Sequence, residues 1–222
     1  MLMNAEKVLS ILAILLSITA ITTSTYVLSV YPSQKVTTTP IEKPLISYLN
    51  IPPNTNFNIT ENDLMYLMDL KPAYAEIFIE NNTIRFTHDK ISIVVTAEPE
   101  LGEEYEDRFV VFGLINPTLI IPVNANVKII FINGGDSEFH SFSVIKTPPP
   151  YPSNLDSPEY MTFAFNGSSI PDPLRGIQFE KPSGIYHGTV IQFTADKPGT
   201  YYYVCHVGDH AHNGMFGQFI VK

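Results

Sequence analysis

The chain has one cysteine, Cys205, in 222 residues. Since a disulfide joins two thiols, none can form within the chain, and Cys205 is left for other chemistry. Charge is also scarce: charged residues make up only 16% of the sequence, with 13 basic against 22 acidic residues and a net charge of −9. Nucleic-acid binding needs a basic surface that displaces counterions. The charge balance therefore argues against a nucleic-acid partner and is compatible with a protein partner that presents a cationic face.

Helical patterns are scarce in residues 56–222, where short stretches rich in β-branched and aromatic residues alternate with turn residues. These stretches predict strands at 74–80, 83–87, 91–96, 109–115, 126–133, 160–165, 184–194, 199–204 and 215–221. Repeated short strands indicate a β-sandwich or barrel, and a chain of this length fits one such domain plus an anchor. We therefore expect an all-β domain.

One segment of this region, residues 59–70, has a helical pattern. Thr60 can cap its start, with Asp63 three residues on. Leu64, Leu67 and Met68 share one face at helical spacing. We expect a surface helix that packs this face against one edge of the sandwich.

Residues 8–30 contain no charged side chain. A membrane-spanning helix needs about 20 predominantly apolar residues, so this run is long enough to cross a bilayer. The alternative is a cleaved signal peptide, whose apolar core is usually about 7–15 residues and whose cleavage site needs a small residue where Ile18 stands. We favour the anchor, and Lys7 points to an outward orientation of the domain that follows.

The sequence therefore predicts three parts. Residues 1–31 form an N-terminal membrane anchor (or signal peptide). Residues 32–55, rich in Thr, Pro and Ser, form a tether that holds the next domain away from the membrane. Residues 56–222 form the β-domain.

Metal-ligating side chains gather near the C-terminus, between two predicted strands. The strand at 199–204 leads into Cys205, and Met215 begins the next strand. The loop between them carries three of the six histidines of the chain. One thiolate, two imidazoles and a weak axial thioether are the ligands of a blue-copper electron-transfer site. We interpret residues 205–215 as a ligand loop for a soft metal ion.

A second imidazole must come from elsewhere in the chain. His140 is the natural candidate, because it lies where a predicted strand and a Gly-Gly-Asp turn give way to another strand. Within the loop we favour His210. His206 directly follows Cys205, so its side chain points to the opposite face of an extended strand, and His212 stands too close to the methionine. The predicted ligands are His140, Cys205, His210 and Met215.

Each predicted ligand has a simpler interpretation. A free cysteine is most often a small buried hydrophobe, a histidine can be a hydrogen-bonded core residue, and a methionine beside Phe216 can fill the core. The neighbouring histidines and methionine favour the metal interpretation for Cys205. Met215 has the weakest claim, because an axial position tolerates other donors.

Two motifs in the C-terminal half carry a family resemblance. Four residues separate Cys205 from His210, and four more separate His210 from Met215. Residues 163–169 are Phe-Ala-Phe-Asn-Gly-Ser-Ser. The spacing is similar to that of rusticyanin and sulfocyanin, and the second motif is similar to the sulfocyanin signature Phe-Asn-Phe-Asn-Gly-Thr-Ser, from which it departs at two positions. The chain thus resembles a cupredoxin, a blue copper protein, of the rusticyanin and sulfocyanin type.

The resemblance implies a cupredoxin-like Greek-key β-sandwich that binds one type 1 copper ion. It implies a carrier of single electrons by outer-sphere transfer rather than an enzyme, with a cytochrome or a terminal oxidase of a respiratory chain as partner. The edge of His210 would be the electron port, within an apolar patch that includes Gly214, Phe216 and residues 148–150. With the predicted anchor, we expect a single-pass cell-membrane protein whose copper domain lies on the extracellular side.

The alternative is a copper-dependent oxidoreductase, similar to nitrite reductase or to an oxidase-associated subunit. The pair Cys205-His206 also resembles the last motif of multicopper oxidases. A trinuclear oxidase cluster needs many paired histidines, whereas the chain has six in all, and Val204 stands where the oxidase motif has histidine. A second copper at His206 would need further histidines, from His88 or His187. A dinuclear site of the oxidase-subunit kind is excluded, because it requires two bridging cysteines.

Overall fold

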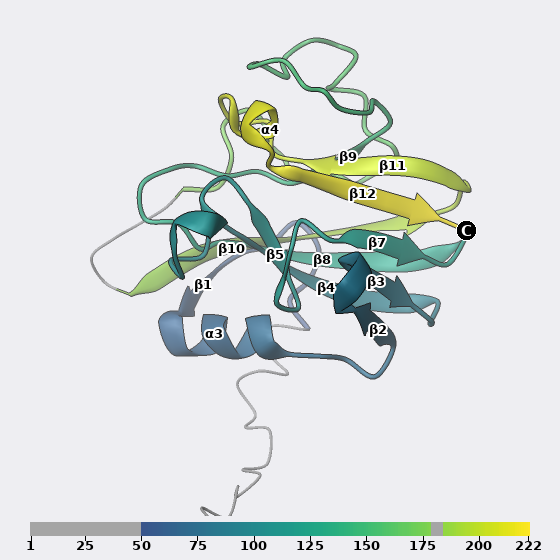
Figure 1. Ribbon diagram of the computed structural model, residues 1–222, viewed down its shortest axis with the longest axis horizontal. Coiled ribbons are helices and arrows are strands. Elements are labelled where there is room, and N and C mark those ends of the chain that lie inside the picture. Colours follow the sequence, from purple (N-terminus) through teal and green to yellow (C-terminus); the bar gives the residue numbers. More distant parts are fainter. Residues whose placement is uncertain (1–49, 179–183) are drawn as a thin grey trace, which may run out of the picture. The chain divides into compact units, whose positions relative to one another are not determined.

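A computed structural model of the chain describes residues 50–178 and 184–222. These residues form two β-sheets and two α-helices (Figure 1). The predicted anchor at 1–31 and most of the predicted tether lie outside the described residues. Neither of the two helices has the length and apolar character that crossing a membrane requires.

The first sheet has six strands in the order β1-β10-β8-β4-β5-β6. They are β1 (Asn56–Thr60), β4 (Lys90–Ala97), β5 (Phe109–Val111), β6 (Leu114–Ile115), β8 (Ala125–Asn133) and β10 (Ile185–Ala195). β8 pairs antiparallel with β10 and parallel with β4 along its length. The parallel pairing sets Ala97 opposite Asn133. β4 and β8 therefore end at the same level of the sheet, and the segments that follow them start side by side.

The second sheet also has six strands, in the order β2-β3-β7-β12-β11-β9. They are β2 (Ala75–Phe78), β3 (Thr83–Phe86), β7 (Thr118–Ile121), β9 (Ser143–Ile145), β11 (Gly199–Val204) and β12 (Phe216–Val221). β11 and β12 pair antiparallel over their whole length, from Gly199 opposite Val221 to Val204 opposite Phe216. The chain between them contains the short helix α4 (His210–Asn213), drawn in yellow in Figure 1.

Side chains from both sheets form one apolar core. Three aromatic rings meet there, those of Phe109 in β5, Tyr203 in β11 and Phe142, which directly precedes β9. The ring centroid of Phe109 lies 5.5 Å from that of Tyr203 and 5.8 Å from that of Phe142. The buried Tyr203 hydroxyl donates a hydrogen bond to the Pro117 carbonyl over 2.6 Å, so its polar group is satisfied. Cys205 and Met215 belong to the same core. The two sulfur atoms of the ligand loop thus lie among apolar side chains.

The predicted helix is confirmed as α3 (Glu61–Asp69), which packs beside β1, β4 and β10. Thr60 caps it as predicted, because its hydroxyl accepts a hydrogen bond from the Asp63 backbone N–H over 3.3 Å. The three apolar residues predicted to share a face, Leu64, Leu67 and Met68, are the buried ones.

Seven of the predicted strands are confirmed to within two residues at each end, and that at 109–115 is wrong. This segment is a hairpin in which β5 pairs antiparallel with β6. Phe112 and Gly113 form its two-residue turn with φ values of 48° and 82°. Positive φ at both positions is what a tight hairpin turn of this twist requires. Phe112 is neither glycine nor asparagine, the residues that usually mark such a turn. The sequence of this segment therefore resembles one continuous strand.

The segment 160–165 was predicted as a strand and is irregular, with one isolated bridge between Phe163 and Ile145. It ends in a turn, where the Ser168 hydroxyl accepts from the Phe165 N–H over 3.1 Å and donates back to the Phe165 carbonyl over 2.9 Å. Side-chain bonds of this kind compete with strand pairing. Conversely, β1 and β7 were not predicted; β7 has only four residues and lies between two parallel neighbours, β3 and β12.

Candidate metal centre

The backbone of the ligand loop is held by hydrogen bonds between its own ends. The Cys205 N–H donates to the Met215 carbonyl over 3.2 Å, and the Met215 N–H donates to the His210 carbonyl over 2.8 Å. Gly214 ends α4 with φ 115°, a value that L side chains rarely adopt. Glycine at this position therefore allows the loop to turn sharply back from α4 into β12.

Three of the four predicted ligands converge. The ligand atoms of His140, Cys205 and His210 all lie within 4.8 Å of one another. The two imidazole Nδ1 atoms are 3.1 Å apart, and Cys205 Sγ lies 3.5 Å from His210 Nδ1. An imidazole nitrogen binds a zinc ion at about 2.0–2.1 Å, so two nitrogens at this separation can share one ion of similar size. One thiolate and two imidazoles are the equatorial donors of a type 1 copper site, and the donor set fits that ion.

His140 reaches the site through the end of β8, although it lies 70 residues before His210. Asn133, the last residue of β8, donates from its side-chain amide to the Glu138 carbonyl over 2.8 Å and to the Ile177 carbonyl over 2.9 Å. Ile177 in turn pairs with His140 through two backbone hydrogen bonds of 2.7 and 3.3 Å. These bonds hold the backbone of the fully buried His140 in place.

Ser141 binds the cysteine sulfur. Its backbone N–H lies 3.3 Å and its hydroxyl 3.6 Å from Cys205 Sγ. The same hydroxyl accepts a hydrogen bond from the His206 backbone N–H over 2.7 Å, which fixes its position. Donors aimed at a sulfur atom stabilise its negatively charged form, and the thiolate is the form that binds metals.

Comparison with known proteins finds copper proteins of two kinds. Residues 116–222 match the sequence model of a family described as multicopper oxidase. Rusticyanin from Acidithiobacillus ferrooxidans is 37% identical over 107 residues, which cover 48% of this chain and 61% of that protein. Rusticyanin from Acidithiobacillus ferridurans is 38% identical over 107 residues, which cover 51% of its length. The chain thus matches little more than half the length of these relatives.

Solved structures extend the likeness to most of the described residues. A solved structure of rusticyanin from Thiobacillus ferrooxidans has 27% sequence identity and a TM-score of 0.56, covering 76% of this chain and 97% of that chain. The NMR structure of reduced rusticyanin has 25% identity and a TM-score of 0.61, covering 77% of this chain and 98% of that chain. The sequence match and the structural match together support a cupredoxin of the rusticyanin type. Its site is of the kind that holds one type 1 copper ion.

The contacts among the three donors favour a thiolate beside charged imidazole. Burial alone would raise the pKa of Cys205, but the hydrogen bonds and positive charge of His140 and His210 prevail and lower it to about 6. Burial likewise opposes a charge on His140, yet its interactions with Cys205 and then Glu98 raise its pKa to about 9. The pKa of His210 is also raised; burial lowers it, and Cys205 outweighs that effect. These contacts therefore favour the thiolate, which is the form of cysteine that binds a metal ion.

Carboxylates contact the outer edges of both histidines, and sequence reasoning missed them. Glu98 Oε2 lies 2.5 Å from His140 Nε2, and Glu138 Oε2 lies 2.7 Å from His210 Nε2. Asp107 Oδ1 is 3.6 Å from His210 Nδ1. Glu138 stands two residues before a predicted ligand, which is a signal that could have found it. Glu98 is 42 residues from His140 and carries no such signal.

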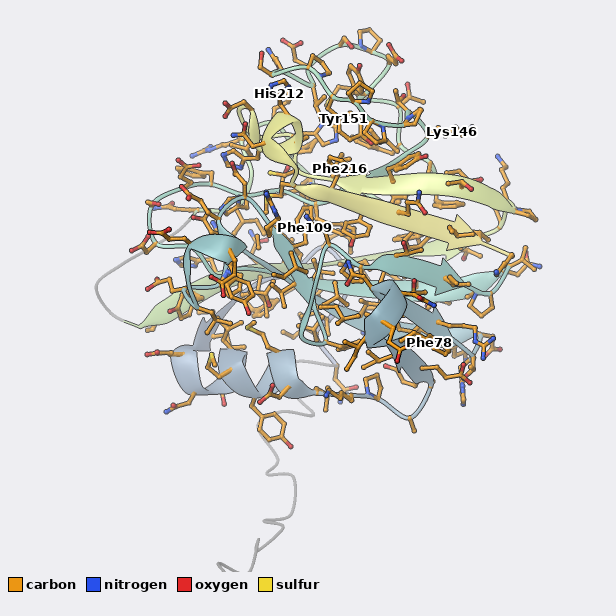
Figure 2. All side chains as sticks on the ribbon, viewed as in Figure 1. Phe78, Phe109, Lys146, Tyr151, His212 and Phe216 are labelled. Carbon is orange, nitrogen blue, oxygen red and sulfur yellow. The ribbon has the colours of Figure 1, made fainter. Side chains whose placement is uncertain are left out.

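The surroundings of His210 combine an apolar side with an acidic side. On the apolar side, Phe216 and the segment 149–151 line a cavity of about 350 Å³ with Ala211 and His212. The rings of Tyr151 and Phe216 meet edge to face with centroids 5.1 Å apart. Figure 2 shows Tyr151, Phe216 and His212 at the α4 end of β12. The predicted apolar surroundings therefore lie on one side of His210, which is 5% exposed, and the carboxylates of Asp107 and Glu138 lie beside its imidazole as well.

The remaining loop side chains differ in their placement. Met215 is fully buried, and its role as the axial ligand stays a prediction. His206 Nε2 lies 2.5 Å from the Ser143 hydroxyl and its ring packs against Phe163, away from the three converging donors, as its place next to Cys205 predicted. His212 is exposed and donates from Nδ1 to the Tyr151 carbonyl over 2.9 Å.

Proposed function

We propose that this cupredoxin carries single electrons between respiratory-chain components by outer-sphere transfer at a type 1 copper site. The ligands would be His140, Cys205, His210 and Met215. The observation that supports this function is the convergence of one thiol sulfur and two imidazole nitrogens in the apolar core. Copper bound there supplies one-electron exchange between its Cu(II) and Cu(I) states.

The chain's own contribution is a rigid and dry set of ligands. The exposed fractions of His140, Cys205 and His210 are 0%, 0% and 5%, so a substrate has no direct approach to the sulfur. Backbone hydrogen bonds close the ligand loop, and the Ser141 N–H donates to the cysteine sulfur. A site that barely moves between two charge states suits electron transfer, because fixed dipoles and ligands cost no reorganisation at the moment of reaction.

The visible spectrum of the copper-loaded full chain tests this proposal. We expect strong absorption from thiolate-to-Cu(II) charge transfer, which disappears after the uptake of one electron per chain and returns on reoxidation. A pale copper complex, or more than one copper ion per chain at full colour, would contradict the proposal. The second result would favour the oxidoreductase instead.

One observation favours the copper-dependent oxidoreductase, namely the match of residues 116–222 to the multicopper oxidase family. The surroundings of His206 argue against it. This histidine is 1% exposed and bound to Ser143, and among the described residues no close group of potential metal ligands includes His206, His88 or His187. Consumption of oxygen or nitrite by the copper-loaded chain, supplied with an electron donor, would establish the enzyme.

We further propose that the redox partner, such as a cytochrome or a terminal oxidase, presents a cationic docking face. The support is the segment 98–107, whose glutamates 100, 103, 104 and 106 are exposed and whose last residue, Asp107, lies beside His210. Opposite charge steers association and raises its rate at low salt. The rate of electron transfer to a cationic cytochrome should therefore fall as ionic strength rises; a rate independent of salt would argue for docking on the apolar side.

Anchoring of the copper domain on the extracellular side of the cell membrane is likewise a proposal. Its support is the charge-free run at residues 8–30, which is long enough to span a bilayer. The full chain should sediment with membranes and resist extraction by alkaline carbonate, whereas a chain without residues 1–35 should be soluble and still bind copper. Release of the full chain by carbonate would overturn the anchor.

A further inference from the structure

The largely buried carboxylate of Glu98 contacts Nε2 of the buried His140. Glu98 Oε2 lies 2.5 Å from His140 Nε2, with side-chain exposures of 19% for Glu98 and 0% for His140. The corresponding pair on the other histidine, Glu138 and His210, is similar in distance at 2.7 Å, but the Glu138 side chain is 55% exposed. Water screens an exposed charge far more than a buried one. Of the two carboxylates, Glu98 therefore acts more strongly on the site.

Backbone hydrogen bonds on both sides of Glu98 hold this residue in position for the contact with His140. Glu98 directly follows β4, with φ 43°, an uncommon value for a residue other than glycine. Its N–H donates to the Arg108 carbonyl over 2.8 Å, and the preceding carbonyl, of Ala97, accepts from the Gly134 N–H over 2.8 Å. A Cβ added at Gly135 would lie 3.3 Å from Glu98 Oε2, so the glycine leaves room for the carboxylate.

A carboxylate at this nitrogen has two physical consequences. Since Nε2 carries the proton that it donates to Glu98, Nδ1 is left as the lone-pair donor, and Nδ1 is the atom that faces His210 across 3.1 Å. In addition, Cu(II) carries one more positive charge than Cu(I). A fixed negative charge beside a ligand therefore stabilises the oxidised ion more than the reduced one.

We propose that Glu98 is a positioning residue that orients the His140 ring for copper binding and, through its charge, lowers the reduction potential of the site. This inference rests on the proposed function, since it requires that copper bind at His140. It concerns a residue outside the predicted ligand set and on a distant segment of the chain.

Substitutions in the full chain separate the effect of ring orientation from the effect of charge. Glu98→Gln keeps the length of the side chain and an oxygen that accepts the same hydrogen bond, but removes the charge. Glu98→Asp keeps the charge but withdraws it by one methylene from Nε2, and aspartate tolerates the left-handed backbone. Glu103→Gln is the matched control, because it removes a charge from an exposed position of the same segment.

The readouts are the midpoint potential, the visible spectrum and the NMR signal of the His140 Nε2 proton in the Cu(I) form. We expect Glu98→Gln to stay blue and to shift the Cu(II)/Cu(I) equilibrium toward Cu(I) about tenfold, or about 59 mV for one electron. Glu138→Gln should shift it less, and Glu103→Gln hardly at all. Glu98→Asp should bind copper about 10-fold more weakly, as when such an outer partner is lost, and its Nε2 proton should exchange faster with water.

The outcomes distinguish this inference from the proposed function. A wild-type protein without the intense charge-transfer band overturns the proposed function and this inference with it. If the wild type is blue but Glu98→Gln shifts the reduction potential no more than Glu103→Gln does, the proposed effect of the Glu98 charge is overturned, and the orienting role still stands. A Glu98→Asp protein with wild-type affinity and a wild-type Nε2 proton signal overturns the orienting role.

Discussion

The ligand loop at residues 205–215 and the acidic segment at 98–107 both reach the metal centre, but they do so in different ways. The loop supplies donor atoms from neighbouring positions, held by hydrogen bonds between its own residues. The acidic segment places Glu98 on His140 and Asp107 near His210. Three of the four predicted donors thus come from one short segment, whereas His140 and the charges around the donors come from distant parts of the chain.

The two histidines show the same contrast. His140 is enclosed by the core and by Glu98, while His210 lies at the edge, between the acidic segment and the apolar residues around Tyr151. Loss of the edge histidine should leave a gap that a small molecule can enter. The following substitutions test this comparison, starting with the largest expected effect.

Cys205→Ser should abolish the intense charge-transfer band. It exchanges a soft thiolate, on which the colour depends, for a hard hydroxyl that copper binds poorly in this setting. The β-fold should remain, because a serine of similar size occupies the same place between β11 and α4. Visible absorption and far-UV circular dichroism check both expectations. Strong colour in the folded variant would show that Cys205 is no ligand.

His210→Ala should lose or greatly change the copper spectrum, and added imidazole should restore it. The reason is that His210 supplies one of the two converging Nδ1 atoms and lies near the surface. His212→Ala is the matched control from the same helix, α4, and should keep the site because its side chain is exposed. If His212→Ala lost copper while His210→Ala kept it, the ligand assignment would be reversed.

His206→Ala should keep the blue spectrum but destabilise the fold by about 1–3 kcal/mol, the cost of leaving a buried partner such as the Ser143 hydroxyl unbonded. Denaturant unfolding of the metal-free protein measures this cost. Loss of the blue colour in a variant that still folds would instead place His206 at the metal and revive a second, catalytic copper.

The same residue predicts a pH dependence of stability. Burial lowers the pKa of His206 to about 4, against about 6.5 in an unfolded chain. Between these values the unfolded state binds more protons, so the contribution of neutral His206 is complete above about pH 6.5 and is lost as the pH falls toward about 4. The shift in pKa corresponds to a loss of about 3 kcal/mol in the free energy of unfolding. The difference in unfolding free energy between wild type and His206→Gln should shrink from pH 7 to pH 4.5; a constant difference would contradict it.

Met215→Leu should keep a blue site and raise its reduction potential, since removal of a weak axial donor from an apolar cage favours Cu(I). A shift on the order of tenfold in the redox equilibrium corresponds to about 59 mV. Cyclic voltammetry measures it. An unchanged potential would mean that the thioether is no axial ligand and that Met215 serves only to fill the core.

The smallest effect is expected from paired Glu103→Gln and Glu104→Gln changes in the exposed part of the acidic segment. Surface substitutions of this kind usually change stability by less than about 0.5 kcal/mol. Electron transfer with a cationic partner should nevertheless slow at low salt and become less sensitive to ionic strength. Stopped-flow rates at two salt concentrations measure the change. A large loss of stability would mean that the segment has a structural rather than an electrostatic role.

The strand pattern and the ligand loop were predictable because both are local. Alternation of side chains along a strand and the spacing of Cys205, His210 and Met215 involve residues close in sequence, whose relative placement follows from backbone geometry. Prediction failed where local patterns were ambiguous. The hairpin of β5 and β6 depends on positive φ at Phe112, a residue that gives no turn signal, and β7 is defined by its two neighbours in the sheet.

By itself, the sequence determined that this chain has the donors of a soft-metal site, a β-rich domain to hold them and too few histidines and cysteines for a larger copper cluster. Only the tertiary structure decided what surrounds the donors. The parallel pairing of β4 with β8 ends both strands at one level, which brings Glu98 to His140. The physical reason is that side-chain chemistry and spacing are properties of a short segment, whereas the electrostatic environment of a buried group is set by whichever distant segments the core packs beside it.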